Sequence, residues 1–534
     1  MKIFSMLACI VLLASFLRLY MLSSVPPSPS LDEVSIGYNA YSILDTGKDE
    51  YGTRFPMLLR AYDDWRPALY AYLVIPFVKM FGLSVLAVRL PSVILSVLTV
   101  FTTYFLVKEL FKRWDIALLT TFLLTISPWH IYISRLGHEV NAGLAFFIFG
   151  MLFFLKEKFP LSAAFFALSF ISYQSEKIFL PILLFGIFFL FKDRILQKKK
   201  QAFFSLLIIC FIVAPFIKAT LEPNALIRFR ATNIFDGNKE RFEKQAILLA
   251  NAVKERNLLG EIFYNRRVVA TQIFFEGYIS HFNPVWVFTN PSNDRHKVPN
   301  LGLLYIWEAP FFILGIIFLV FGNFDKKNKY LIFFWMLIAP LPAAITTDAP
   351  HALRIYQMLP IPQILTSIGL LQTFSFLKNY HIGKVIFTSL FSILVVSSLL
   401  YFYYEYFIIF PKTQSASFQY AISKAIPFVL ETEKSYNKIV FSNKDNLYQS
   451  YMFFLFYSKY DPRLYQKQGG TKSGGFAETH TFGKYTFRPF NFVKEDASNT
   501  IYIGNNINFP TGISFIKKFA NLDGKEVIEI VQKR

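Results

Sequence analysis

The sequence predicts a polytopic α-helical membrane protein of about eleven transmembrane helices, followed by a small C-terminal α/β domain. Three observations predict this class. The 534 residues are 54% hydrophobic and 17% charged, whereas soluble domains carry about 25% charged residues. The apolar residues form long runs with the charges gathered between them, which is the pattern of many membrane spans. A more polar segment with strand-like runs follows the last apolar run.

The expected spans are apolar runs that approach the roughly 20 residues needed to cross a bilayer. Several are shorter, so a count of about ten to twelve stays open. The run 69–82 is too short and contains Pro76, so we expect an interfacial or re-entrant helix there. The first run lacks a convincing cleavage site, which favours an uncleaved span over a signal peptide. The spans are expected at 3–22, 85–107, 116–134, 139–155, 160–174, 177–191, 202–218, 303–322, 330–346, 354–376 and 384–410.

The lysines and arginines set the expected orientation. Basic loops alternate with poorly basic ones, and the positive-inside rule places the basic loops in the cytoplasm. An odd number of spans then gives a cytoplasmic N-terminus and an extracytoplasmic C-terminal segment, in the inner (plasma) membrane. Such tracts explain the net charge of +20 better than nucleic-acid binding does. The basic loops carry Lys108, Lys112 and Arg113; Lys156 and Lys158; 192–200; 326–329; Lys378 and Lys384.

We expect two domains, a transmembrane domain at 1–410 and an extracytoplasmic α/β domain at 411–534. The first has outer loops at 23–84, rich in acids, and at 220–302, largely helical and amphipathic. The second has strand-like runs at 438–442, 500–504 and 526–531, and helical patterns near 415–433 and 447–457. Its glycine-rich run at 469–475 lacks the spacing of a phosphate-binding loop and is interpreted as a flexible turn. No internal repeat stands out, which disfavours transporters built from inverted repeats.

A carboxylate pair, Asp32 and Glu33, begins a helical pattern in the first outer loop. Ser30 and Glu33 have the spacing of a capping box, and acids are favoured in a first helical turn, so a cap is the alternative explanation for Glu33. The cap does not require Asp32. A carboxylate there, near the outer membrane surface, can accept a proton from an attacking hydroxyl. Asp32 and Glu33 are therefore the candidate catalytic residues.

The same loop continues with Asp63, Asp64 and Arg66, which supply two more carboxylates and a guanidinium. Arg66 can hold a phosphate through two parallel hydrogen bonds. The alternatives are a solvated loop for Asp63 and lipid head-group contact for Arg66.

Further charged residues lie at the expected outer ends of spans. Charge near a bilayer is costly, so it usually faces protein or a water-filled cavity, although each residue alone could instead extend to the interface. Their gathering on one side favours a shared cavity. This set comprises Arg89, Arg135, His138, Glu139, Glu176, Lys177, His351 and Arg354. The candidates for binding the phosphate or sugar of a donor are Asp64, Arg66, Arg89, Arg135, Glu139, His351 and Arg354.

The outer face has no nucleotide sugars or ATP, so a donor there must arrive already activated, as a polyprenyl-phosphate sugar does.

These residues resemble motifs of the multi-span glycosyltransferases of the protein O-mannosyltransferase and lipid A aminoarabinose transferase superfamily, which have the GT-C fold. The resemblance is sharpest over about 1–110. Asp32-Glu33 stands where these families carry an Asp-Glu pair, and Arg66 to Leu69 is similar to their Lys-Pro-Pro-Leu or His-Pro-Pro-Leu element. Arg89 to Ser92 resembles the Arg-Leu-x-Ser opening of the second span, and His351 to Arg354, with Pro360 after it, is similar to a late loop of bacterial members.

Two departures limit the resemblance. Arg66 and Ala68 replace a Lys or His and a second Pro, and the β-trefoil insertion of eukaryotic protein mannosyltransferases is missing, so the chain resembles a bacterial member.

The resemblance implies an inverting displacement. Asp32 would deprotonate or orient the acceptor hydroxyl, and Arg66, with Arg89 or Arg354, would neutralise the departing polyprenyl phosphate. The acceptor would be a hydroxyl or phosphate on a protein, lipid or glycan. Neither a cofactor nor a metal is expected, since the branch does not generally need a metal and His281, His296 and His351 are scattered along the sequence. Cys9 and Cys210, both in apolar runs, predict neither a disulfide nor a metal site.

Three other classes stay open. A transporter or flippase would place charges at mid-span and show repeats. An O-antigen ligase or polymerase would carry its signature loop late in the chain. A non-enzymatic scaffold that displays the C-terminal domain would not need so many outer charges beside the bilayer.

Overall fold

The computed structural model of the chain describes residues 2–62, 64–222, 234–289, 296–377, 381–444, 447–472, 479–495 and 499–533. Its packing divides the chain into two compact units. Unit 1 consists of Met1–Ser15, Ser96–Ile133 and Val140–Leu400, and unit 2 of Phe16–Leu95, Ser134–Glu139 and Tyr401–Arg534. Packing thus groups the C-terminal segment with the first outer loop, while the expected domains at 1–410 and 411–534 stay a prediction.

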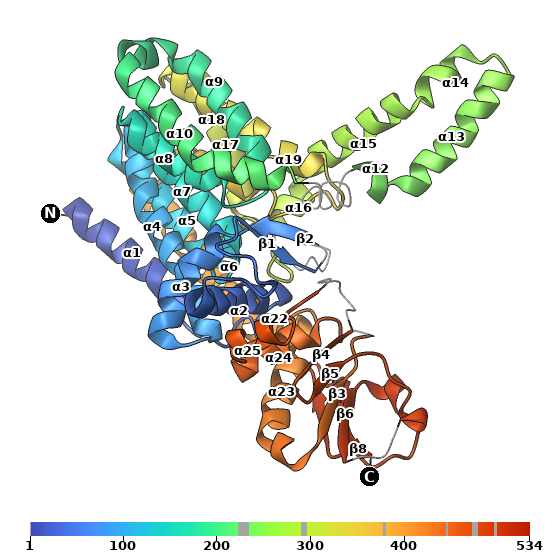
Figure 1. Cartoon of the computed structure of the whole chain (residues 1–534). Coiled ribbons are helices and arrows are strands. Elements are labelled where there is room, and N and C mark those ends of the chain that lie inside the picture. Colours follow the sequence, from blue (N-terminus) through green and yellow to red (C-terminus); the bar gives the residue numbers. More distant parts are fainter. Residues whose placement is uncertain are drawn as a thin grey trace. The chain divides into compact units, whose positions relative to one another are not determined.

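A helix lies at each expected span, so the prediction of a helical membrane protein is confirmed. These helices are α1 (Lys2–Leu19), α4 (Val85–Phe111), α5 (Trp114–Ile126), α6 (Pro128–Ser134), α7 (Glu139–Leu155), α8 (Phe159–Phe170), α9 (Glu176–Gln197), α10 (Lys199–Thr220), α17 (Glu308–Phe321), α18 (Lys326–Ile338), α19 (Leu341–Ala344), α20 (Ile361–Leu377) and α21 (His381–Tyr403). Figure 1 labels those from α1 to α19.

Within the described residues, four helical stretches are long and apolar enough to cross a membrane alone: α1, α4, α10 and 382–413. The pair α5 and α6 makes a fifth span if it is counted as one, although it bends by 58°. Pro128 explains this break, because a proline lacks the N–H of a continuing helix and disfavours the helical conformation of the residue before it. The expected count of about eleven spans stays a prediction.

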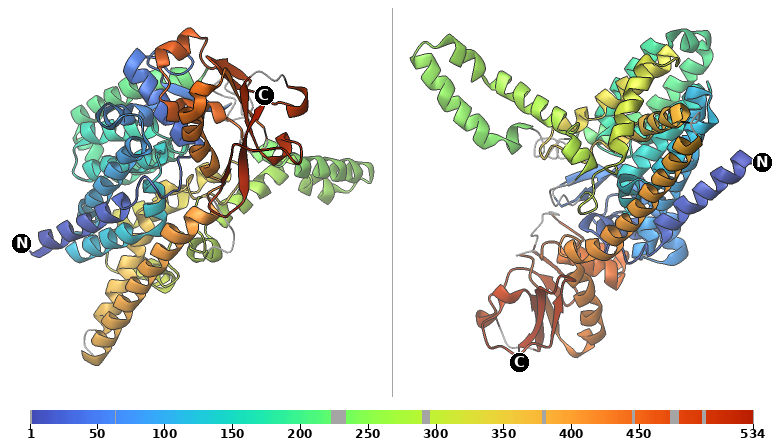
Figure 2. Two further views of the ribbon diagram at one scale, coloured as in Figure 1. Left: turned by 90° about the horizontal axis from the view of Figure 1, so that it is seen from below. Right: turned by 180° about the vertical axis from the view of Figure 1, so that it is seen from behind.

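The segment 220–302, predicted as the second outer loop, is largely helical where it is described, as its amphipathic pattern predicts. It contains α12 (Ile234–Gly237), α13 (Lys239–Lys254), α14 (Leu258–Phe263), α15 (Arg266–Ser280) and α16 (Pro284–Phe288). α13 and α15 run side by side as two arms joined through α14 (Figures 1 and 2). Arg241 on α13 donates two hydrogen bonds to Glu276 on α15, at 2.6 and 2.9 Å, and so ties the arms together.

The segment 23–84, predicted as the first outer loop, belongs to unit 2. It contains α2 (Leu31–Thr46), the antiparallel hairpin of β1 (Leu58–Ala61) and β2 (Asp64–Pro67), and α3 (Leu69–Phe81), the helix expected at 69–82. The hairpin pairs Leu59 with Arg66 and Ala61 with Asp64. Asp63 lies outside the described residues.

The C-terminal segment is a mixed α/β domain, as predicted. Its six-stranded sheet has the order β4-β5-β3-β6-β8-β7, in which β3 pairs in parallel with β5 and β6 and the other pairs are antiparallel. The predicted strands are β3 (Lys438–Phe441), β6 (Thr500–Gly504) and β8 (Glu526–Lys533), and the predicted helices are α23 (Tyr420–Thr432) and α24 (Ser450–Ser458). The remaining elements are β4 (His480–Phe482), β5 (Tyr485–Phe487), β7 (Lys517–Ala520), α22 (Phe410–Thr413), α25 (Pro462–Lys467), a π-helix at Tyr404–Ile409, and short 3-10 helices at Tyr356–Met358, Glu433–Ser435, Phe492–Lys494 and Asn506–Asn508.

This sheet buries side chains on both faces, which explains its continuous apolar strands. On one face Val440 packs in a cluster with Tyr502, Phe492 and other apolar side chains. On the other, the ring of Phe441 stacks on Phe487 with centroids 5.0 Å apart. Ser473 to Gly475 of the glycine-rich run lie outside the described residues.

Helix α2 is covered by the C-terminal segment within unit 2. A Cβ atom at Gly37 would come within 2.6 Å of the Phe456 ring of α24, so only glycine fits this approach. The Tyr38 hydroxyl donates to the carbonyl of Tyr460, and Arg463 of α25 pairs with Asp45 at 2.8 Å. The helix that carries the candidate acids is therefore held by residues more than 400 positions later.

Candidate functional site

Asp32 and Glu33 lie side by side in the first turn of α2 but have different surroundings. The Ser30 hydroxyl accepts from the Glu33 N–H at 3.2 Å, and the Glu33 carboxylate accepts from the Ser30 N–H at 2.8 Å. This is the predicted capping box, and it is confirmed. Glu33 is buried, whereas the Asp32 side chain is 46% exposed. Of the two acids, Asp32 is the one that solvent or a substrate can reach.

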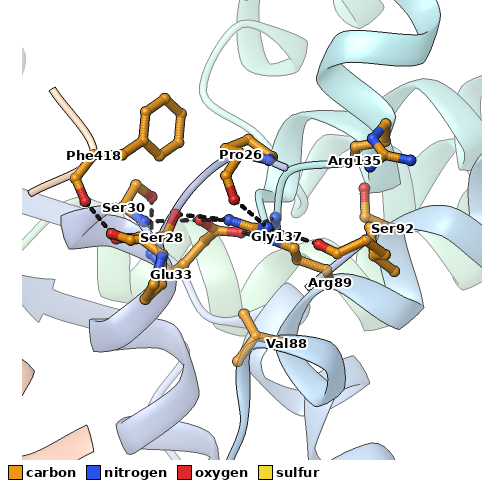
Figure 3. A network of polar contacts seen from close by, with 12 residues as sticks. Pro26, Ser28, Ser30, Glu33, Val88, Arg89, Ser92, Arg135, Gly137 and Phe418 are labelled. Carbon is orange, nitrogen blue, oxygen red and sulfur yellow. Dashed lines mark hydrogen bonds and ion pairs between the residues drawn. The ribbon is translucent and has the colours of Figure 1, made fainter. Parts of the chain in front are cut away.

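The Glu33 carboxylate is held from several sides (Figure 3). Arg89 Nε donates to Oε1 at 2.7 Å, and Arg89 Nη2 donates to Oε2 at 3.1 Å. The N–H of Gly137 also donates to Oε1, at 2.9 Å. A Cβ atom at Gly137 would lie 2.6 Å from Val88 and 3.2 Å from Glu33 Cγ, so this approach requires glycine. Glu33 thus joins α2, α4 and the loop after α6.

Every N–H of Arg89 is donated to protein. Besides Glu33, its acceptors are the carbonyls of Leu22 at 2.8 Å, Pro26 at 3.1 Å and Ser28 at 2.8 Å. The guanidinium has five N–H groups, and these five bonds use all of them. Arg89 is also fully buried. Its geometry therefore does not fit the predicted role in holding a donor phosphate; it fixes the chain that leads into α2.

Arg135 is also a buried structural cation, which likewise does not fit the predicted phosphate role. It donates to the carbonyls of Leu17 at 3.0 Å, Arg18 at 2.9 Å and Val25 at 2.9 Å. Its guanidinium lies over the Phe407 ring, 5.0 Å from the centroid. Burial lowers its pKa from the ordinary value. Arg89 and Arg135 together bind carbonyls of residues 17–28, from the last turn of α1 to the start of α2.

Asp32 pairs with Arg66 of β2, with Oδ1 and Nη2 3.0 Å apart. The Arg66 side chain is only 5% exposed, so the accessible carboxylate rests on a buried cation. Burial opposes the charge of Arg66, but Asp32, then Glu139, Tyr62 and Asp64, raise its pKa above the ordinary value. The structure thus brings together Asp32, Asp64, Arg66 and Glu139 of the predicted set, all in unit 2.

Glu139 is the least satisfied of these acids. It is 3% exposed, and its Oε2 atom has no hydrogen-bond partner among the described residues. The nearest basic atom to Oε2 is Nδ1 of His138, at 3.5 Å. Asp64 accepts the N–H of Trp65 at 2.7 Å. A buried carboxylate oxygen that accepts no hydrogen bond from the described residues, beside Arg66 and the exposed Asp32, offers an acceptor to a polar ligand.

His351 and Arg354 lie in unit 1. The N–H of His351 donates to Nε2 of His281 at 3.1 Å, and the His351 ring stacks on His296 with centroids 4.7 Å apart. Arg354 donates to the Thr346 hydroxyl at 2.7 Å. The three histidines, far apart in sequence, are therefore neighbours. No group of three or more His, Cys, Asp or Glu suited to a metal occurs in the described part of the chain, and the expected independence from metals stays a prediction.

An apolar cavity of about 170 Å³ lies beside this histidine group in unit 1. Trp129, His281, Met336 and Met358 are among its lining residues. Of the other charged residues predicted at span ends, Glu176 is buried, and Lys177 lies over the ring of Phe216.

A buried polar chain in unit 2 was missed from the sequence. Asn39 donates to Glu50 at 2.9 Å, and the Thr471 hydroxyl donates to Glu50 at 2.7 Å. The Tyr465 hydroxyl lies 2.7 Å from both Thr471 Oγ1 and His480 Nε2. No local pattern signals this chain, because Asn39 and Glu50 are separated by more than 400 positions from Tyr465, Thr471 and His480.

Comparison with known proteins agrees with this architecture. The sequence model of a family described as dolichyl-phosphate-mannose-protein mannosyltransferase matches residues 65–218, less than a third of the chain. No curated protein sequence matches.

Two solved structures share the fold. One is ArnT from Cupriavidus metallidurans bound to undecaprenyl phosphate, with a TM-score of 0.54, 11% identity, and coverage of 98% of this chain and 97% of that chain. The other is the archaeal oligosaccharyltransferase AglB from Archaeoglobus fulgidus, in complex with an inhibitory peptide and a dolichol-phosphate, with a TM-score of 0.52 and 14% identity. That match covers 85% of this chain, which spans 63% of the length of that protein.

The protein therefore has the GT-C fold of multi-span membrane glycosyltransferases, as the resemblance of its motifs predicts. Within that class, its matched segment is similar to the dolichyl-phosphate-mannose-protein mannosyltransferases.

Proposed function

We propose that this protein transfers a sugar from a polyprenyl-phosphate-linked donor to an acceptor hydroxyl or phosphate on the extracytoplasmic face of the membrane, with inversion at the anomeric carbon. The observation that carries the proposal is the accessible Asp32 carboxylate held 3.0 Å from the buried Arg66 cation. The donor class is supported by the undecaprenyl phosphate and dolichol-phosphate in the two similar structures and by the description of the matching family.

Asp32 is the proposed base. The acceptor oxygen attacks the anomeric carbon from the face opposite the phosphate and forms the new glycosidic bond. The bond between that carbon and the phosphate oxygen breaks, and its electron pair leaves with the polyprenyl phosphate. The acceptor proton passes to Asp32, a transfer that typically contributes about 10²–10⁴ in rate. Glu33 positions α2 and keeps no oxygen free for this step, since both accept bonds from Arg89.

The departing phosphate needs positive charge. Arg66 supplies it, but Asp32, Asp64 and Glu139 already surround this single guanidinium. Arg89 takes no part in this step, because all of its N–H groups are donated to protein. The roles of Arg354 and His351, which lie in unit 1, stay predictions. Stabilisation of a developing charge by one such donor is typically worth about 3–4 kcal/mol.

The lipid part of the donor needs an apolar site. The cavity beside His281 and Trp129 is the proposed position for one isoprenoid portion of that chain. The sugar can be a hexose or a pentose, and the acceptor a protein, lipid or glycan.

The test is direct. The purified full-length chain, in sealed proteoliposomes, is supplied with polyprenyl-phosphate sugars, and free polyprenyl phosphate is measured. Release of the phosphate together with glycosylated acceptor is expected. If the donor instead crosses the bilayer intact, with its glycosyl–phosphate bond unbroken, the protein is a flippase and the proposal fails.

A further inference from the structure

The arms α13 and α15 meet at a tip whose surface is unusually apolar. Between positions 247 and 263, large apolar side chains are 41–73% exposed. They are Ile247, Leu248, Val253, Leu258, Leu259, Ile262 and Phe263. α14 contributes four of them in six residues, so this short helix has little apolar interior of its own. Exposed apolar residues gathered in this way mark a surface that contacts something else.

The tip is a built structure. Asn257 caps α14 by accepting the N–H of Gly260 at 3.0 Å. A Cβ atom at Gly260 would lie 2.7 Å from the Cβ of Ala252, so the turn packs closely against the end of α13. The arms behind it are joined by the Arg241–Glu276 pair. The apolar residues are therefore presented on a closed turn.

The charges around the tip are mainly positive. From Val253 to Val268 the chain has four basic residues and two acidic ones. The basic residues Lys254, Arg256, Arg266 and Arg267 flank α14 on both sides. Farther from the tip, α13 is covered by exposed ion pairs of both signs, Lys239–Glu243 and Lys244–Glu240. Apolar residues bordered by lysine and arginine are the composition of helices that lie in a membrane interface.

The hairpin follows α10 in the chain, one of the helices long and apolar enough to cross a membrane. α13 has 16 residues and therefore a length of about 24 Å. An open, apolar groove of about 780 Å³ also runs along α15, lined by Val268, Phe275, Ile279 and Pro284 among others. The hairpin is thus close in sequence to a helix that can lie in lipid, and the apolar groove is suited to an acyl chain.

We propose that the tip formed by 247–267 inserts into the interfacial region of the bilayer, with Leu258, Leu259, Ile262 and Phe263 among the acyl chains and the flanking basic residues at anionic head groups. The inserted tip fixes the hairpin as a second membrane anchor besides the spans. The proposal does not depend on the proposed sugar transfer, and its test needs no catalysis.

The experiment uses the full-length protein in which Cys9 and Cys210 are replaced by serine. A nitroxide label is attached at Leu259→Cys in one variant and at Lys244→Cys, on the polar part of α13, in a matched control. In nanodiscs, collisions of each label with oxygen and with a water-soluble nickel complex are compared by electron paramagnetic resonance. The label at 259 is expected to favour oxygen several-fold, as in lipid, and the label at 244 the nickel complex.

Lipid composition separates the contribution of the apolar side chains from that of the flanking basic residues. Nanodiscs of phosphatidylcholine are compared with nanodiscs of phosphatidylcholine and phosphatidylglycerol. Deeper insertion of the label at 259 is expected with the anionic lipid. The variant Lys254→Gln, Arg256→Gln, Arg267→Gln is expected to lose that difference while the label still favours oxygen.

Two outcomes would overturn the proposal. A label at 259 that is as accessible to the nickel complex as the label at 244 would mean that the tip stays in water. A label that is immobile and shielded from both reagents would mean that the tip packs against protein, either a second copy of the chain or an acceptor protein.

Discussion

Two adjacent acids in one helical turn serve different purposes because of where their side chains point. Glu33 accepts from Ser30, Gly137 and Arg89 and is buried, whereas Asp32 makes an ion pair and is half exposed. An acid that must receive a proton has to be reachable, and an acid that fixes a helix has to be occupied. In the proposed mechanism, chemistry and architecture are thus divided between neighbouring residues.

Asp32→Asn is expected to lower the rate of sugar transfer by about 10²–10⁴ without changing the amount of folded protein, because the amide cannot accept the acceptor's proton. The measurement is release of polyprenyl phosphate by equal amounts of each protein. Asp45→Asn, the same change on the same helix, removes only the contact with Arg463 and serves as control. Equal rates for Asp32→Asn and the unchanged protein would rule out this base.

Glu33→Gln is expected to destabilise unit 2 by about 3–5 kcal/mol, because it leaves the buried guanidinium of Arg89 without its counter-charge. Folded protein recovered from membranes, and its thermal unfolding in detergent, are the measurements. The double variant Glu33→Met, Arg89→Met removes both charges and should recover part of the loss. If the single variant is as stable as the unchanged protein, the pair has no structural role.

At the scale of elements, α2 and α15 show how a short segment sets the environment of a functional residue. α2 begins at a capping box and ends at Gly47 in the left-handed region, with φ of 71°. Both ends of the helix are thus specified by neighbouring residues. Asp32 is the second residue of α2. At the end of α15, His281 is buried, and its Nδ1 lies 2.7 Å from the carbonyl of Gly277.

Ser30→Ala is expected to weaken the first turn of α2 by about 1 kcal/mol, because the hydroxyl that accepts the Glu33 N–H is lost. Hydrogen exchange of the amides of residues 31–35 is the measurement. Ser30→Asn, which can still cap the helix, should keep most of the protection. Unchanged exchange in the alanine variant would show that Arg89 alone holds this turn.

Acid is expected to loosen the end of α15. Burial, and then the charge of Arg354, lower the pKa of His281 to about 4, although the Gly277 carbonyl favours the protonated ring. Because the folded pKa lies below the ordinary value of about 6.5, the contribution of His281 to stability is fully present above pH 6.5. It is lost as the pH falls toward 4.

Hydrogen-exchange protection at residues 276–281, corrected for the intrinsic effect of pH on exchange, should therefore fall in that window by up to about two orders of magnitude. In His281→Asn, which cannot titrate there, this fall should be absent. An equal fall in both proteins would assign it to His296 or His351.

At the scale of the whole molecule, the first outer loop and the C-terminal segment share one compact unit. Gly37 receives the Phe456 ring, and Glu50 receives the Thr471 hydroxyl. The C-terminal domain therefore supports the helix that carries Asp32.

Phe456→Ala is expected to destabilise unit 2 by about 3–5 kcal/mol, because it empties the space over Gly37. Transfer should fall as well, since α2 loses its cover. Thermal unfolding and the release of polyprenyl phosphate are the measurements, with the partly exposed Tyr448→Ala as control. Full activity of a well-folded Phe456→Ala protein would show that sugar transfer does not need this contact between the C-terminal segment and α2.

The amino-acid sequence by itself determined the features that depend on neighbouring residues. Apolar runs predict the helices, the spacing of Ser30 and Glu33 predicts the cap, and continuous apolar strands predict β3, β6 and β8, because periodicity, capping and burial of short runs are local properties. The strands β1, β2, β4, β5 and β7, which have only three or four residues each, were not predicted.

Only the tertiary structure decided which charged residues can act. Arg66, Arg89 and Arg135 look alike in sequence. Yet Arg89 donates all five of its N–H groups, and Arg135 four, to carbonyls of residues 17–28 and to Glu33 or Tyr406. Arg66, in contrast, supports the exposed Asp32. The two residues of each of these contacts are at least 34 positions apart in the sequence, as Asp32 and Arg66 are. Sequence spacing carries no information about such contacts. Whether a guanidinium binds a ligand depends on how many of its donors the fold has already used, and that count exists only in three dimensions.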